Sequence, residues 1–121
     1  MKEDKITILV AEDNASNYKL LNVILSRDYH LVHAWNGKEA VEMFSECHPQ
    51  LILMDIEMPE MNGYEATAAI RRLSPDIPIM ALTAYAYASD EERILKSGMN
   101  AYMSKPIDFR LLRQRISELL G

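Results

Sequence analysis

LILMD, residues Leu51–Asp55, decides the fold of this chain, because it runs straight into the turn-rich stretch IEMPEMNG at residues 56–63. An unbroken apolar run of this length is typical of a strand buried on both faces of a parallel sheet. Asp55 places a carboxylate where that strand ends, a position at which packing needs no charge. An earlier run of the same kind, Ile6–Ala11, ends in Glu12 and Asp13. Two strands that end in three carboxylates indicate a site for a hard cation or a phosphoryl group.

Apolar runs of strand length alternate along the chain with segments in which apolar residues recur at helical spacing. The predicted strands are Ile6–Ala11, His30–Ala34, Leu51–Met54, Ile77–Leu82 and Ala101–Met103. The predicted helices lie in between and after them, at Leu20–Leu25, Ala40–Phe44, Ala66–Leu73, Asp90–Lys96 and from Asp108 to the end. For the fourth helix we expect the capping box Ser89-x-x-Glu92 at its start and Gly98 at its end, and Asp108 is a good N-cap for the fifth.

This alternation predicts an α/β fold: a doubly wound, flavodoxin-like (βα)5 three-layer sandwich, with helices on both faces of a parallel sheet. In the strand order 2-1-3-4-5 the first and third strands are neighbours, which brings Glu12 and Asp13 close to Asp55. Ligands of such sheets bind beyond the carboxyl ends of the strands. Thr83 and Lys105 also lie at or just past predicted strand ends, so they should converge on the same edge.

Length and composition indicate a single domain over residues 1–121. Apolar residues make up 49% and charged residues 26% of the chain, the balance of a globular protein rather than a disordered one. The net charge of -5 argues against nucleic-acid binding, which needs a basic surface. No apolar run approaches the ~20 residues of a membrane span, the N-terminus is charged, and the lone Cys47 fits a reducing compartment. We therefore expect a cytoplasmic domain that binds neither nucleic acid nor membrane.

Three ionised carboxylates at one edge repel one another, by about 4 kcal/mol for a pair ~4 Å apart at an effective dielectric of about 20. A divalent cation relieves that repulsion. Mg²⁺ (or Mn²⁺) suits oxygen ligands and often bridges a carboxylate to a phosphate. The competing interpretation is that the acids cap the following helix, as Asp13 or Asn14 can, but capping explains neither Glu12 nor Asp55.

Lys105 precedes Pro106 at the end of the last predicted strand. Its ammonium can pair with Asp55, or with a group attached to Asp55, as a compact point charge. A cis bond to Pro106 would aim that ammonium inward. Thr83 can donate its hydroxyl to a phosphoryl oxygen beside the small Ala84. Considered alone, Lys105 would be interpreted as an ordinary exposed lysine, and Thr83 as a β-branched residue at the end of a strand.

Taken in order along the chain, these motifs resemble those of a receiver domain of two-component signalling, the response regulator fold. The matching residues are Glu12-Asp13, Asp55, Met58-Pro59 with Gly63, Thr83-Ala84 and Lys105-Pro106. Each motif by itself has low specificity, whereas the ordered set is highly specific. The resemblance covers essentially the whole chain.

The resemblance implies that Asp55 is a phosphoacceptor. Its carboxylate would attack the phosphoryl group of a phosphohistidine on a histidine kinase or a histidine-phosphotransfer domain. The reaction would need Mg²⁺, with Lys105 and Thr83 neutralising charge on the phosphoryl oxygens during transfer. The implied metal ligands are Glu12, Asp13, Asp55 and the backbone carbonyl of Glu57. Such a domain is not a conventional enzyme, because it catalyses only its own phosphorylation and dephosphorylation.

Thr83 and Tyr102 resemble the family's switch pair, in which the hydroxyl moves to the phosphate and the aromatic ring turns inward. The implied output is a changed surface around the fourth helix, the fifth strand and the fifth helix. A weak homodimer through the fourth and fifth helices is a further expectation, with acidic residues 90–92 facing basic residues 110–115. Glu57 and Tyr85 occupy positions that vary in the family and influence how quickly the phosphoryl group is hydrolysed.

A narrower resemblance, to the receivers of hybrid sensor histidine kinases, is carried by Glu12-Asp13-Asn14 with Asn17, by Met54–Gly63 and by Gly98-Met99. It implies a module of such a kinase, compatible with a membrane-anchored parent, and a stand-alone regulator is the alternative. Histidine-phosphotransfer helices should approach past the first helix and the loop after the last strand. The candidate contacts there are Asn14, Ala15, Tyr18, Ile107 and Phe109.

Three other classes compete with the receiver interpretation. A phosphatase of the haloacid dehalogenase type wants Asp-x-Asp at the nucleophile, where this chain has Asp55-Ile56-Glu57. A flavodoxin-like carrier would bind the phosphate of FMN, which an acid-lined site repels. A degenerate receiver that serves only as a docking scaffold would not need the complete set of site residues.

Overall fold

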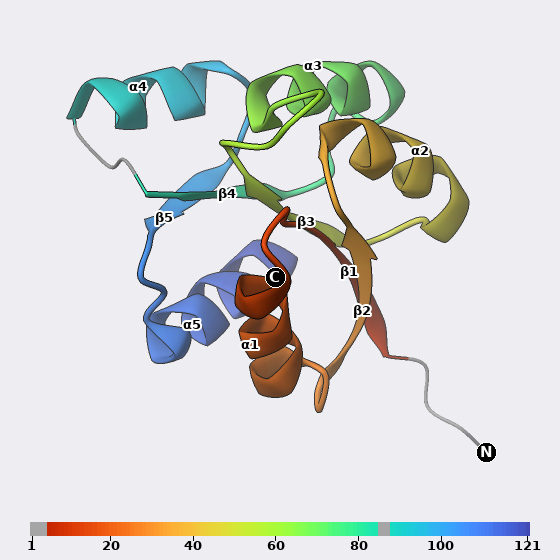
Figure 1. The fold of residues 1–121 in the computed structure, drawn as a ribbon, viewed down its shortest axis with the longest axis vertical. Coiled ribbons are helices and arrows are strands. Elements are labelled where there is room, and N and C mark those ends of the chain that lie inside the picture. The colour runs from red at the N-terminus through yellow and green to blue at the C-terminus, as the bar shows by residue number, and fades with distance from the viewer. Residues whose placement is uncertain (1–4, 85–87) are drawn as a thin grey trace.

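The computed structural model describes residues 5–84 and 88–121 and has the predicted α/β architecture (Figure 1). A five-stranded parallel sheet runs in the order β2-β1-β3-β4-β5, as predicted. Its strands are β1 (Ile6–Ala11), β2 (Tyr29–Ala34), β3 (Leu51–Asp55), β4 (Ile79–Thr83) and β5 (Ala101–Ser104). The helices are α1 (Ala15–Leu25), α2 (Gly37–Cys47), α3 (Gly63–Leu73), α4 (Ala88–Lys96) and α5 (Phe109–Leu120). None of the helices in the described part is long and apolar enough to cross a membrane.

Helices cover both faces of the sheet, with α1 and α5 on one side and α2, α3 and α4 on the other (Figure 1). Side chains alternate along each strand, so each strand supplies both cores. In β3, Leu51 and Leu53 pack toward α1 and α5, while Ile52 and Met54 pack toward α2, α3 and α4. The strand is buried along its whole length, which is why its sequence shows no polar alternation.

Strand alternation also decides where the acids point. Ile8 and Val10 belong to the core under α1 and α5, and Glu12 continues that series from β1. Leu51 and Leu53 belong to the same core, and Asp55 continues it from β3. Because β1 and β3 are paired neighbours, Glu12 and Asp55 end on the same side of adjacent strands.

Several predicted element boundaries differ from the structure, and two of them, the starts of the fourth strand and the fourth helix, were wrong for identifiable reasons. The fourth strand begins at Ile79 and not at Ile77, because Pro78 has no N–H to donate to a ladder; only its carbonyl accepts, from the N–H of Ile52 at 3.0 Å. Helix α4 begins at Ala88, so Ser89 lies inside the helix and is not the N-cap of a capping box. The side chain of Ser89, like the whole of Tyr85, lies outside the described residues.

Other helix ends agree with the predictions. Asp108 is the N-cap of α5 and accepts from the backbone N–H groups of Arg110 and Leu111. Gly98 follows α4 with φ 107, in the left-handed region that glycine enters without strain. A capping box does occur in the chain, at the start of α3, where the side chains of Asn62 and Glu65 each accept from the other's backbone N–H.

Thr67 carries the one buried side-chain oxygen that lacks a hydrogen-bond partner within the described part of the chain. It lies on α3 and is 0% exposed. A buried hydroxyl without a partner costs about 1–3 kcal/mol, and valine has nearly the same shape. We expect Thr67→Val to raise the free energy of unfolding by ~1 kcal/mol and the Tm by ~4 °C. Urea and thermal unfolding measure this, and a loss of stability with Val would show that the hydroxyl is bonded in solution.

Candidate metal centre

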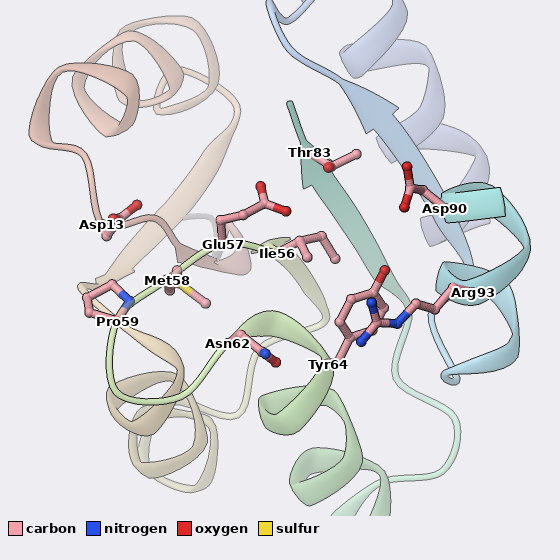
Figure 2. A pocket seen from close by; sticks show the side chains of 10 residues that line it. All are labelled: Asp13, Ile56, Glu57, Met58, Pro59, Asn62, Tyr64, Thr83, Asp90 and Arg93. Atoms are coloured by element: carbon pink, nitrogen blue, oxygen red, sulfur yellow. The ribbon is translucent and has the colours of Figure 1, made fainter. Parts of the chain in front are cut away.

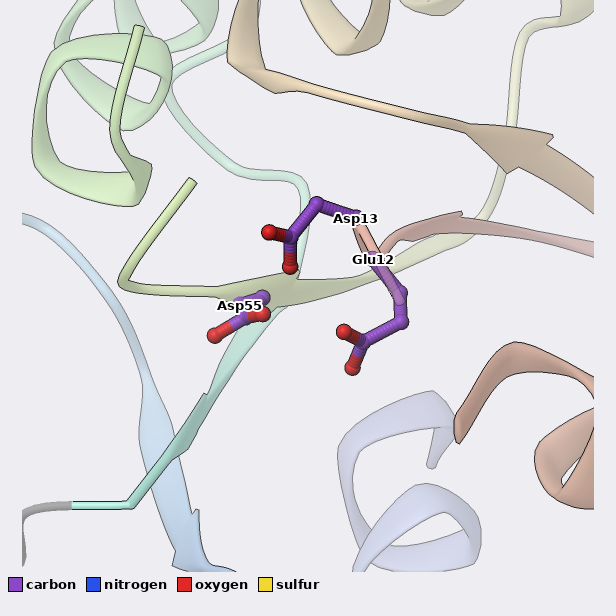
Figure 3. Close-up of side chains that lie close together, drawn as sticks. All are labelled: Glu12, Asp13 and Asp55. Carbon is purple, nitrogen blue, oxygen red and sulfur yellow. The ribbon is translucent and has the colours of Figure 1, made fainter. Parts of the chain in front are cut away.

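Three carboxylates meet beyond the carboxyl ends of β1 and β3, as predicted (Figure 3). One oxygen from each of Glu12, Asp13 and Asp55 lies within 4.8 Å of the others. Glu12 is 1% exposed and Asp55 2% exposed, whereas Asp13 is exposed and opens the cluster to solvent. The cluster is therefore a mostly buried set of hard oxygen donors with one side accessible, an arrangement that fits Mg²⁺ or Mn²⁺.

Lys105 supplies the positive charge closest to this cluster. Its Nζ lies 3.2 Å from Oε1 of Glu12 and 3.3 Å from Oδ2 of Asp55. The backbone N–H of Lys105 donates to the carbonyl of Thr83 at 2.7 Å, which ties the residue to the end of β4. The bond from Lys105 to Pro106 is cis, the geometry that the sequence left open for it.

The charges in this cluster do not balance. Burial raises the pKa of Asp55, the negative charge of Glu12 raises it further, and Lys105 only partly offsets both, so that the pKa reaches about 8. Burial lowers the pKa of Lys105, but the charges of Asp55 and Glu12 outweigh burial and raise it above its ordinary value. One ammonium thus faces three carboxylates, and a bound divalent cation would let Asp55 ionise at neutral pH.

An open cavity of about 650 Å³ lies beside the acids, lined by Asp13, Glu57, Asn62, Thr83 and Arg93 among others (Figure 2). The side chain of Glu57 is exposed at its rim, and its backbone N–H approaches Oδ1 of Asp55 at 3.3 Å. The start of the loop after β3 therefore lies against the Asp55 carboxylate. That the Glu57 carbonyl is a metal ligand stays a prediction.

Gly63 allows this loop to close. It is the first residue of α3, and its N–H donates to the carbonyl of Ile56 at 2.9 Å. A Cβ at this position would lie 2.5 Å from the carbonyl oxygen of Asp55, well inside contact distance. A glycine is needed here so that α3 can start directly against the backbone of the acidic strand.

The two residues of the expected switch lie on adjacent strands. Thr83 is 2% exposed, ends β4 and lines the cavity beside the acids. Tyr102 lies on β5, half-buried against the core under α4, and pairs in register with Ala81. A hydrogen bond to Glu91 of α4 raises the pKa of the Tyr102 hydroxyl. The movement of this pair on phosphorylation stays a prediction.

Some contacts of the site could not be found from the sequence. Nε2 of His33 lies 2.8 Å from the carbonyl oxygen of Glu12. The guanidinium of Arg93 lies 4.2 Å above the ring of Tyr64, which joins α4 to α3 beside the cavity (Figure 2). A single histidine in a strand and a single arginine on a helix carry no motif, so only the fold shows which residues they meet.

Residues 8–117 match the family model of the response regulator receiver domain. The chain is 41% identical over 120 residues to hybrid signal transduction histidine kinase I of Dictyostelium discoideum, covering 91% of the chain and 7% of that kinase. It is 39% identical over 118 residues to the polar-differentiation response regulator DivK of Brucella ovis, covering 95% of the chain and 96% of DivK. The chain thus spans a small part of the kinase but nearly all of DivK.

Solved structures agree. The receiver domain of sensor histidine kinase PA1611 from Pseudomonas aeruginosa PAO1, with a magnesium ion coordinated in its active-site cleft, is 34% identical with a TM-score of 0.89, covering 97% of this chain and 98% of that one. The Ssk1 receiver of Saccharomyces cerevisiae, in complex with the histidine phosphotransfer protein Ypd1, is 32% identical with a TM-score of 0.89, covering 98% and 91%. With the family match and the predicted strand order both present, the chain belongs to the response regulator receiver domain family of two-component signalling.

Proposed function

We propose that Asp55 accepts a phosphoryl group from a phosphohistidine of a histidine kinase or histidine-phosphotransfer protein. The observation that carries this proposal is the placement of a buried aspartate at a strand end, beside two further acids and a paired lysine. In the reaction an Asp55 oxygen bonds to phosphorus while the P–N bond to the donor imidazole breaks. The bonding electron pair returns to that nitrogen, and the imidazole leaves neutral because its other nitrogen carries a proton. The product is an aspartyl-phosphate and a neutral histidine.

The residues around Asp55 have distinct parts in this transfer. Glu12, Asp13, Asp55 and the Glu57 carbonyl would hold Mg²⁺, which when bound neutralises charge on the phosphoryl oxygens. Lys105, already 3.3 Å from Asp55, would contact another of those oxygens, and the Thr83 hydroxyl at the cavity wall a third. The same site hydrolyses the aspartyl-phosphate when water reaches it, so the domain catalyses its own dephosphorylation.

The surface that we propose responds to phosphorylation is formed by α4, β5 and α5. An aspartyl-phosphate at position 55 carries about two negative charges in place of the one on the carboxylate, together with new acceptor oxygens, which would draw Thr83 inward and leave space for Tyr102 to follow. Tyr102 also lines a groove between α4 and α5 with the partly exposed Leu95 and Leu111. Changing this surface changes what binds there, and a weak homodimer that sets acidic α4 against basic α5 is one such complex.

The proposed donor-binding surface is an apolar groove between α1 and the loop after β5. It is lined by Leu20, Leu21, Ile107 and Phe109 and reaches Lys105 at its inner end. Leu20 is 55% exposed, so the groove offers apolar surface that a partner helix could cover. The groove lies next to the acids, so a phosphotransfer helix bound in it could present its histidine to Asp55. The relative solved with Ypd1 supports this kind of partner.

A prediction follows for this groove. Leu20→Asp should slow transfer from a phosphorylated histidine-phosphotransfer protein by about 10-fold or more, because it places a charge in the apolar contact. Phosphorylation by acetyl phosphate should not change, since that donor needs no groove. The matched control is Val23→Asp, since Val23 is 68% exposed on the same helix but does not line the groove. Equal slowing by both substitutions would place the donor elsewhere.

We further propose that the chain acts as a cytoplasmic module of a hybrid sensor histidine kinase. The similarity to a hybrid signal transduction histidine kinase of Dictyostelium and to the receiver domain of the sensor histidine kinase PA1611 supports this origin. The similarity to DivK over almost its full length supports the alternative, a stand-alone regulator. Either would use the same site.

Mass spectrometry after incubation with acetyl phosphate and Mg²⁺ tests the function. The wild-type chain should gain a single adduct of about 80 Da, the mass of one HPO₃ group, and EDTA should prevent it. Asp55→Asn should gain none. No adduct on the wild type, or an adduct that persists in Asp55→Asn, would refute the phosphoacceptor role, and repeated turnover of a phosphate ester would favour the phosphatase.

A further inference from the structure

Both backbone polar groups of Glu12 are bonded by β2, the edge strand next to β1. The N–H of Glu12 donates to the carbonyl of Ala34 at 3.0 Å. The carbonyl of Glu12 lies 2.8 Å from Nε2 of His33, which must donate because a carbonyl oxygen only accepts. The first bond continues the strand ladder. The second is made by a side chain, and the ladder does not require it.

The peptide unit that His33 contacts is the one joining Glu12 to Asp13. A peptide unit is planar, so fixing the direction of its oxygen fixes the rotation of the whole plane. That rotation sets ψ of Glu12 and φ of Asp13, and therefore the angle between the two side chains. Asp13 is exposed and makes no other contact that would orient its backbone from outside the loop, among the interactions found in the described chain. Lys105 and the N–H of Asn14 hold the Glu12 carboxylate, and the His33 contact adds the restraint on the peptide plane that sets the angle between the two acids.

The His33 ring is itself held in place. The Tyr18 ring stacks on it with centroids 3.7 Å apart and planes within 2° of parallel. Trp35 meets it at 4.2 Å and 44°. Tyr18 belongs to α1, the helix that begins just after the acidic loop, and Trp35 follows β2. The donor is therefore oriented by rings from two different segments before any cation arrives, which lowers the entropy that binding must remove.

We propose that His33 is a positioning residue, which orients the Glu12–Asp13 peptide so that both carboxylates are preset for a divalent cation. The inference rests on the proposed function only in that Glu12 and Asp13 are taken as Mg²⁺ ligands. Partners that orient metal ligands in this way contribute about 10- to 100-fold to metal affinity. Tyr18 and Trp35 support the same bond indirectly by holding the ring.

Two substitutions of His33 separate its hydrogen bond from its ring. His33→Phe keeps an aromatic ring between its neighbours and removes the donor. His33→Gln removes the ring and keeps an amide N–H at about the reach of Nε2. We expect the Kd for Mg²⁺, measured by isothermal titration calorimetry, to rise about 10-fold in His33→Phe and to stay within about threefold in His33→Gln. The matched control is His30→Phe, an exposed histidine on the same strand, with an unchanged Kd.

The alternative is that His33 only stabilises the fold, in which case both variants would lower the Tm and leave the Kd for Mg²⁺ unchanged. An unchanged Kd in folded His33→Phe, or equal weakening in both variants, would overturn the proposal. If His33→Phe does not fold, Tyr18→Leu decides, because it frees the ring without touching the donor: about threefold weaker Mg²⁺ binding supports the proposal and an unchanged Kd overturns it.

The test does not depend on phosphoryl transfer. A wild-type chain that binds Mg²⁺ but gains no phosphoryl adduct would refute the proposed function and leave the His33 comparison intact. If the wild type is phosphorylated at Asp55 but His33→Phe binds Mg²⁺ with an unchanged Kd, the proposed function is supported and the positioning role of His33 is refuted. Trp35, the only tryptophan of the chain, contacts His33, so its fluorescence gives a second record of the same titration.

Discussion

Lys105→Met is expected to slow phosphorylation by acetyl phosphate about 100-fold or more while tightening Mg²⁺ binding about 10-fold. The ammonium contributes to transfer because it would contact the phosphoryl oxygens as their charge develops, and removing one such contact typically costs ~3 kcal/mol. In the unphosphorylated protein the same ammonium lies 3.2 Å from Glu12 and 3.3 Å from Asp55, where it competes with the metal for negative charge. Without the ammonium, the negative charges of Glu12 and Asp55 attract Mg²⁺ more strongly.

Opposite changes in rate and affinity are the informative result. A general loss of structure would weaken both, and a residue that merely held the metal would weaken affinity first. Mass spectrometry measures the rate and isothermal titration calorimetry the Kd for Mg²⁺. Lys96→Met is the matched control, because Lys96 is exposed on α4 and pairs only with Glu92. Weaker Mg²⁺ binding in Lys105→Met would contradict the charge argument.

The site could be predicted from the sequence as far as strand ends determine it. Asp55 and Glu12 each terminate a continuous apolar run, and parallel strands put their carboxyl ends on one edge. The order 2-1-3-4-5 then makes those ends adjacent. Strand period adds that Glu12 and Asp55 share a side of the sheet, where Lys105 meets them. These features follow from the apolar pattern of each strand and from the strand order, so they can be predicted from a single sequence.

Contacts between side chains of distant elements could not be predicted in this way. His33 belongs to no sequence motif, and its position in a strand does not show that its ring meets the Glu12 carbonyl beyond the end of the neighbouring strand. Nor does the sequence show that Thr67 is buried without a partner, since threonine is common on the exposed face of helices. The wrong N-cap at Ser89 has a related cause. The motif Ser-x-x-Glu is short enough to occur inside a helix as well as at its start, and here α4 already begins at Ala88.

Asp55→Asn is expected to be more stable than the wild type in the absence of metal, by ~5 kcal/mol at pH 8, with the difference vanishing toward pH 4. The pKa of Asp55 is raised from its ordinary 3.8 to about 8 by burial and by Glu12. Between those two values the folded wild type holds a proton that the unfolded chain releases, so wild-type stability falls as pH rises. Asparagine does not titrate, and the groups that do not interact with Asp55 cancel in the difference.

Mg²⁺ should reverse this ordering in part, because it stabilises whichever chain binds it more tightly. The wild type keeps the full set of acids and gains stability as Mg²⁺ is added, whereas Asp55→Asn has lost one of its carboxylates and gains less. Urea unfolding from pH 4 to pH 8, with EDTA or with Mg²⁺, measures both effects. A stability difference that does not change with pH would mean that Asp55 is ionised in the metal-free fold. The acids would then be balanced by Lys105 alone, and a signalling site that needs a cation to become reactive would lose its physical basis.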